Sequence, residues 1–87
     1  MIEKPTSVIS QFAFAMIEVF KTNVRDQIQA KMILSMIHDV FKNYKANFDL
    51  DDRDNILRVA SHTEQIEVPT LVDLLNRCGI QAEVLPD

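Results

Sequence analysis

Few side chains in this chain are of a type that could do chemistry. Cys78 is the single thiol, and His38 and His62 are the two imidazoles in 87 residues. A lone thiol forms no intrachain disulfide and offers a metal one sulfur ligand. His38 has no second ligand three or four residues away, and His62 has only Glu64 nearby, which would make a weak site. We interpret both histidines as polar surface residues and Cys78 as a buried structural thiol.

Two further groups resemble metal ligands on first reading. Residues 49–54 hold four aspartates, but this stretch lacks the glycine and the terminal glutamate of a calcium-binding loop, so we interpret it as a hairpin turn. Met32 and Met36 are spaced as two thioethers on one side of a helix. We assign this pair to the core, because it lies on the apolar stripe that must face a sheet.

Composition and charge exclude several classes of function. The chain has no serine or cysteine beside a plausible base and only one glycine, so we expect no catalytic residue, no phosphate loop and no cofactor. The net charge of −4 disfavours nucleic acid and an anionic membrane as partners. No apolar run reaches the roughly 18 residues of a membrane helix. With a lone thiol, these features indicate a cytoplasmic protein that is not an enzyme.

The elements that would position these residues begin with a strand over residues 16–22. Asn23 follows as a predicted helix N-cap, with Asp26 three residues later as in a capping box. The helix is predicted to continue to about Asn43, since apolar residues recur there at intervals of three and four. The members of this stripe are Ile28, Met32, Ile33, Met36, Ile37, Val40 and Phe41.

The second half of the chain repeats the pattern of strands and one helix. Residues 46–50 and 56–60 are predicted strands around a polar turn, and Val68-Pro69 opens a second helix. Gly79, just past that helix, is predicted to be its left-handed cap, and residues 80–84 form a last strand. Right-handed crossovers place both helices on one face of an antiparallel sheet. The expected fold is therefore α+β, a ferredoxin-like βαββαβ sandwich over residues 16–87.

Residues 1–15 are predicted to be an N-terminal extension, in which periodicity does not distinguish a strand from a short helix. Residues 8–19 are rich in apolar side chains, more than one face of a short strand can bury. We therefore expect self-association through the first strand and the segment before it, most simply as a homodimer. The alternative is that the extension folds back over its own domain.

Four stretches together resemble the heavy-metal-associated domains of copper chaperones and metal-transporting ATPases. They are 19–24 (VFKTNV), 47–51 (NFDLD), 56–59 (ILRV) and 74–85 (LLNRCGIQAEVL). The chain looks most like the small stand-alone bacterial versions, whose first strand runs into a Lys-Thr-Asn turn. The resemblance implies a Cys-x-x-Cys metal site before the first helix, but Asp26 and Gln29 occupy those two positions. The resemblance therefore implies the fold of these domains but not their thiolate metal site.

These observations lead to three hypotheses about function. The first is a non-enzymatic interaction module that has lost its metal site and binds a protein partner or itself. The second is a metal-binding protein with other ligands, such as Asp26 with His62 or with groups from a second chain. The third, a small-ligand sensor that uses the space between sheet and helices, has only the fold behind it.

Overall fold

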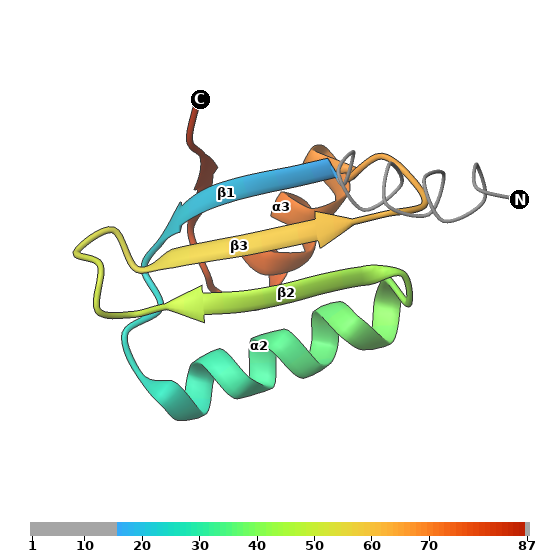
Figure 1. Ribbon diagram of the computed structural model, residues 1–87. Helices are drawn as coiled ribbons and strands as arrows, with labels where there is room; N and C mark the ends of the chain where they lie inside the picture. The colour runs from blue at the N-terminus through green and yellow to red at the C-terminus, as the bar shows by residue number, and fades with distance from the viewer. Residues whose placement is uncertain (1–15, 87) are drawn as a thin grey trace, which may run out of the picture.

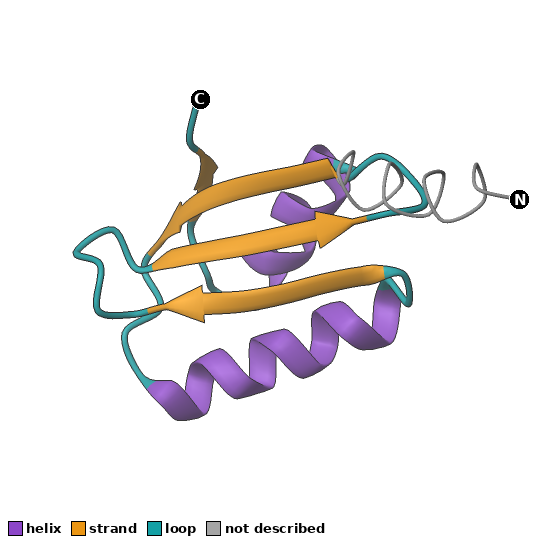
Figure 2. Ribbon diagram, in the orientation of Figure 1, coloured by secondary structure: helices purple, strands orange, loops and turns teal. Residues whose placement is uncertain are grey.

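Four strands and two helices follow one another in residues 16–86, the part of the chain that the computed structural model describes (Figures 1 and 2). The extension expected over residues 1–15 lies outside this part. In chain order the elements are β1 (Met16–Thr22), α2 (Gln27–Val40), β2 (Tyr44–Asp49), β3 (Ile56–Ser61), α3 (Val68–Arg77) and β4 (Ala82–Val84). Neither helix in the described residues has the length and apolar character needed to cross a membrane.

The strands form one antiparallel sheet in the order β2-β3-β1-β4. Each helix connects two strands that are not adjacent, and α3 lies behind the sheet while α2 runs along β2 (Figure 1). This is the strand order of the ferredoxin-like sandwich, so the expected α+β fold is confirmed. The predicted hairpin with its polar turn is also present, although β2 begins at Tyr44, two residues before its predicted start.

Alternation along the strands separates a covered face from an open face. Phe20 of β1 is buried and lies opposite Leu57 of β3, whereas Ile17 is 57% exposed and lies opposite Ala60. The same register places Lys45 beside Ala60 on the open face. Ile17 and Val19 therefore point away from the face used by Phe20.

The core lies between the covered face and the two helices. The strands contribute Phe20, Tyr44, Leu57 and Val59, the helices contribute Ala30, Ile33, Ile37, Leu71 and Leu75, and the loops contribute Val24 and Ile80. Part of the predicted helix stripe is absent from this core: Ile28, Met32 and Val40 are 73%, 67% and 55% exposed. The prediction that Met32 is a core residue is therefore wrong, because α2 turns the side with Ala30 and Ile33 toward the sheet.

The start of α2 also differs from the expectation. The N-cap is Asp26, whose Oδ1 accepts hydrogen bonds from the N–H groups of Ile28 (2.7 Å) and Gln29 (3.1 Å). Asn23, the predicted N-cap, belongs instead to the loop between β1 and α2. The helix therefore begins three residues later than predicted, and it also ends earlier, at Val40.

The end of α3 agrees with its prediction. Gly79 has a φ of 80°, in the left-handed region that glycine adopts without strain. Ile80 then donates its N–H to the carbonyl of Leu75 (2.9 Å), which satisfies one of the last carbonyls of the helix. β4 is shorter than predicted and begins at Ala82.

Candidate functional site

Asp26 and Gln29, the two positions where the resemblance implies cysteines, lie at the start of α2 and serve the helix. Asp26 uses its carboxylate as the N-cap, and Gln29 donates its backbone N–H to that same carboxylate. Both side chains are exposed. Carboxylate and amide oxygens are hard ligands, and two of them alone hold no soft metal ion. This end of the molecule keeps the geometry of a helix start without a thiolate site.

Asp26 and His62 do not come together within one chain. Asp26 precedes the start of α2, whereas His62 follows the end of β3, and these ends lie on opposite sides of the molecule (Figure 1). The hypothesis of a shared Asp26–His62 site is therefore wrong for a single copy. Within residues 16–86 no three side chains from histidine, cysteine, aspartate and glutamate gather as metal ligands.

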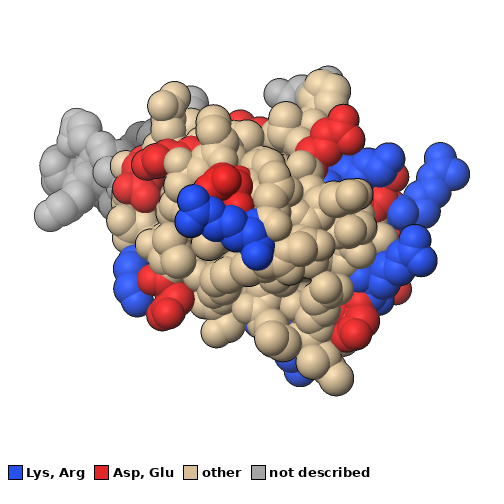
Figure 3. Space-filling view, turned by 180° about the vertical axis from the view of Figure 1, so that it is seen from behind, with Lys and Arg blue, Asp and Glu red and all other residues tan. Residues whose placement is uncertain are grey.

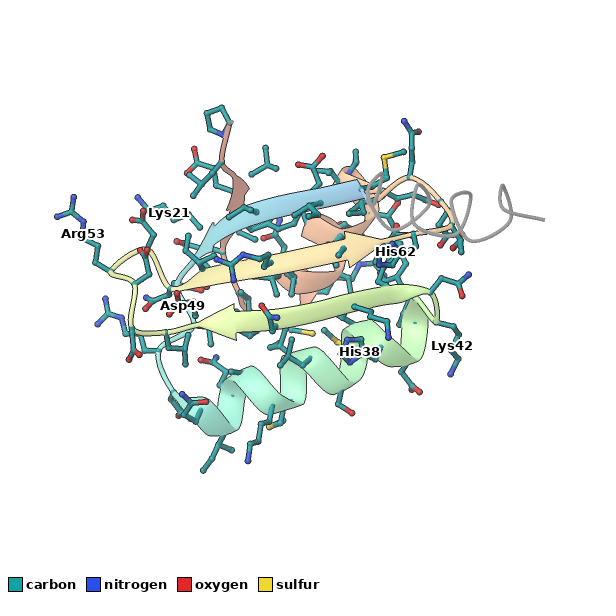
Figure 4. The ribbon with its side chains drawn as sticks, in the orientation of Figure 1. Lys21, His38, Lys42, Asp49, Arg53 and His62 are labelled. Atoms are coloured by element: carbon teal, nitrogen blue, oxygen red, sulfur yellow. The ribbon has the colours of Figure 1, made fainter. Side chains whose placement is uncertain are left out.

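His62 instead shares an open hollow of about 550 Å³ with His38, between the end of α2 and the start of β2. Figure 4 places His38, Lys42 and His62 toward this end of the molecule, away from Arg53 and Lys21. His38 is exposed, as expected, but Nε2 of its ring accepts a hydrogen bond from the N–H of Ala46 (3.0 Å). The ring of His38 is therefore the hydrogen-bond acceptor for one backbone N–H group of β2, which is an edge strand of the sheet. Sequence spacing carried no signal for this contact.

The aspartates of the hairpin form turn hydrogen bonds. Asp49 accepts a bond from the N–H of Asp51 (3.2 Å), and Asp52 accepts one from the N–H of Asp54 (2.8 Å). Such bonds from a side chain to the backbone two residues ahead are typical of Asx turns. The interpretation of this cluster as a turn is confirmed.

Cys78 lies on the surface, so the expectation of a buried thiol is wrong. It is the C-cap residue of α3, and its Sγ lies 3.2 Å from Sδ of the half-buried Met36 on α2. The burial of Leu75 one turn earlier does not extend to Cys78, which follows the last helical residue, Arg77. This contact joins α2 to the C-terminal end of α3.

Exposed apolar side chains are the most distinctive surface feature of the described residues. Six large ones are exposed by 38–73%, and they fall into two groups. The first group lies at the free part of β1 and on β4, and consists of Met16, Ile17 and Val84. The second group lies on α2 and consists of Ile28, Met32 and Val40. The three on α2 are spaced by multiples of four residues, whereas Ile17 points to the open face of the sheet and Met16 and Val84 point to the covered face. A group of exposed apolar side chains on one element is typical of a binding surface.

The free part of β1 also has an uncovered edge. β4 pairs with β1 only from Phe20 to Thr22, and a last hydrogen bond joins Leu85 to the carbonyl of Val19 (2.8 Å). Among the described residues, no strand pairs with Met16–Glu18 on that side. An unpaired strand edge with apolar neighbours can accept a further strand.

On the helix side of the molecule, a broad area over α2 and the adjoining part of α3 has no charged residues (Figure 3). Acidic and basic residues lie around this area in the same view (Figure 3). A centre that is poor in charged residues, with a polar border, is typical of a protein–protein interface.

Comparison with known proteins identifies no relative of this chain. No protein-family model, no curated protein and no solved structure matches the chain.

Proposed function

We propose that this chain is a non-enzymatic interaction module that acts by self-association or by binding another protein. The single observation that supports this proposal is the set of six exposed apolar side chains in a domain of this size. A small domain gains stability by burying such side chains, so leaving them exposed costs free energy that binding can recover. In this proposal the module resembles a heavy-metal-associated domain whose thiolate site has been replaced by Asp26 and Gln29.

The proposal includes the kind of partner and the compartment. A net charge of −4 favours a protein partner over nucleic acid or an anionic membrane. The exposed thiol of Cys78 suits a reducing compartment, so we propose a cytoplasmic location. Self-association is the simplest form of the function, because one apolar surface then meets its own copy.

Light scattering after size-exclusion chromatography tests self-association. We expect the mass of the full chain to rise from monomer toward dimer as the concentration increases from micromolar to hundreds of micromolar. The same measurement after deletion of residues 1–15 tests whether the first strand and the preceding segment carry the contact. A full chain that stays monomeric throughout this range contradicts self-association.

Titration with Cu(I), Zn(II) and Ni(II) separates this proposal from a metal-binding function with other ligands. The proposal predicts no one-to-one complex tighter than micromolar under reducing conditions. Asp26 supports this expectation, because its carboxylate already accepts two backbone hydrogen bonds. A tight stoichiometric complex would favour the metal-binding alternative.

A further inference from the structure

One row of apolar side chains runs along the outside of α2. Its members recur every four residues: Ile28, Met32, Met36 and Val40. Three of them are more than half exposed, and Met36 is half-buried against Cys78. The side of α2 that faces the core carries Ala30, Ile33 and Ile37 instead. The row therefore contributes little to the core of its own chain.

The spacing of this row makes it complementary to itself. Positions 28 and 40, and positions 32 and 36, are equally distant from position 34. When two copies of α2 run antiparallel about that point, Ile28 of one copy meets Val40 of the other, and Met32 meets Met36. A two-fold dimer requires such pairing, because the same surface serves both partners. When two helices cross at about −50°, the row with four-residue spacing on one helix runs parallel to the same kind of row on the other. The whole row can therefore make contact.

The neighbouring row on α2 adds complementary charge. It consists of Gln27, Lys31, Ser35 and Asp39, all of them exposed. In the antiparallel arrangement Lys31 of one copy lies near Asp39 of the other, and the two-fold axis repeats this contact. Asp39 already pairs with Lys42 (3.6 Å), but both side chains are highly exposed, so this contact is weak.

We infer that α2 is the dimer surface of this protein, with a second copy of the chain packed antiparallel on the row of Ile28, Met32, Met36 and Val40. This inference rests on the proposed function and specifies its surface and partner. Methionine side chains are flexible and polarisable, and they suit a surface that must pack against its own copy. Four side chains per copy bury less than the roughly 800 Å² per partner of a stable complex, so the dimer is weak and depends on concentration.

Sedimentation equilibrium of the full chain and two matched variants tests the inference. Met32→Lys introduces a charge at the centre of the row, at a side chain that is 67% exposed, and it should weaken dimerisation at least tenfold. Ile17→Lys makes the same change on the competing surface at β1, at a side chain that is 57% exposed, and a dimer formed through α2 predicts that this variant keeps the native affinity. Both sites are exposed, so both variants should keep the unfolding midpoint of the native chain.

A charge exchange tests the antiparallel direction. Lys31→Asp alone and Asp39→Lys alone should each weaken the dimer, and the variant that carries both changes should recover most of the native affinity. A double variant as weak as the two single variants combined contradicts the antiparallel arrangement.

The possible failures can be distinguished. A dimer that survives Met32→Lys but is lost in Ile17→Lys overturns the α2 surface and leaves self-association through β1 intact. A native chain that is monomeric at hundreds of micromolar overturns both the inference and self-association as the proposed function.

Discussion

Asn23 and Gln81 hold together two loops that lie 58 positions apart in the chain. The N–H of Gln81 donates to Oδ1 of Asn23 (2.9 Å), and the N–H of Asn23 donates to the carbonyl of Gln81 (3.3 Å). The loop before α2 is thereby joined to the loop before β4. Asn23 therefore stabilises the tertiary fold, although its position suggests a helix cap.

Asn23→Ala should lower the free energy of unfolding by about 1 kcal/mol, because the N–H of Gln81 loses its side-chain acceptor. Urea unfolding followed by circular dichroism measures this change. Asn76→Ala is the control, since Asn76 is exposed on α3 and its replacement should change stability by less than about 0.5 kcal/mol. An unchanged urea midpoint for Asn23→Ala would show that the hydrogen bond from Gln81 to the Asn23 side chain contributes nothing to stability.

Asp26→Ala should destabilise the protein by about 0.5–2 kcal/mol, because the N–H groups of Ile28 and Gln29 lose their cap. Asp26→Asn retains an oxygen acceptor and loses only the interaction of the charge with the helix dipole, about 0.3–1 kcal/mol. Unfolding curves should therefore rank the native chain above Asp26→Asn, and Asp26→Asn above Asp26→Ala. The reverse order of the two variants would contradict the capping role.

Tyr44→Phe should destabilise the connection that leads into α3. The buried Tyr44 accepts a hydrogen bond from the N–H of Glu67 (2.8 Å) and donates one to the carbonyl of Gln65 (3.3 Å), while its ring stacks on Phe41 with centroids 4.6 Å apart. The variant keeps the ring and removes both hydrogen bonds, at a cost of about 1–2 kcal/mol. Amide hydrogen exchange should be faster at Glu67, and an unchanged rate there would show that the hydroxyl is dispensable.

The double change Asp26→Cys with Gln29→Cys should create a soft-metal site if the resemblance to heavy-metal-associated domains is correct. The two residues are separated by three positions at a helix start, where thiolates are stabilised by the N-terminal end of the helix. In a Cys78→Ser background, competition with a chromophoric chelator should detect a one-to-one Cu(I) complex. Asp26→Cys alone is the control and should bind weakly. No gain in the double variant would count against the resemblance.

The sequence predicted the order of the elements because its local signals are strong. Alternation identified β1 at its observed bounds, Pro69 marked the start of α3, and Gly79 marked its end. The predictions failed where two local signals competed. Asn23 and Asp26 are both good N-cap residues, and the choice between them depended on the bond of Asn23 to a loop near the other end of the chain.

The candidate surface was less predictable than the fold. The apolar residues of α2 cover more than one side of the helix, so spacing alone does not show which side meets the sheet. The exposure of Met32 and of Cys78 follows from the packing of α2 and from the point at which α3 ends. Neither property is encoded in a short stretch of residues.

The sequence by itself determined the element order, the turn chemistry of the aspartates and the absence of a cysteine pair at Asp26 and Gln29, because each depends on residues that are close in the chain. Only the tertiary structure decided which side of α2 faces solvent, that His38 binds the edge of β2, and that Asp26 and His62 lie apart. These features depend on contacts between distant segments, and local preferences are overridden when the sheet and helices pack together.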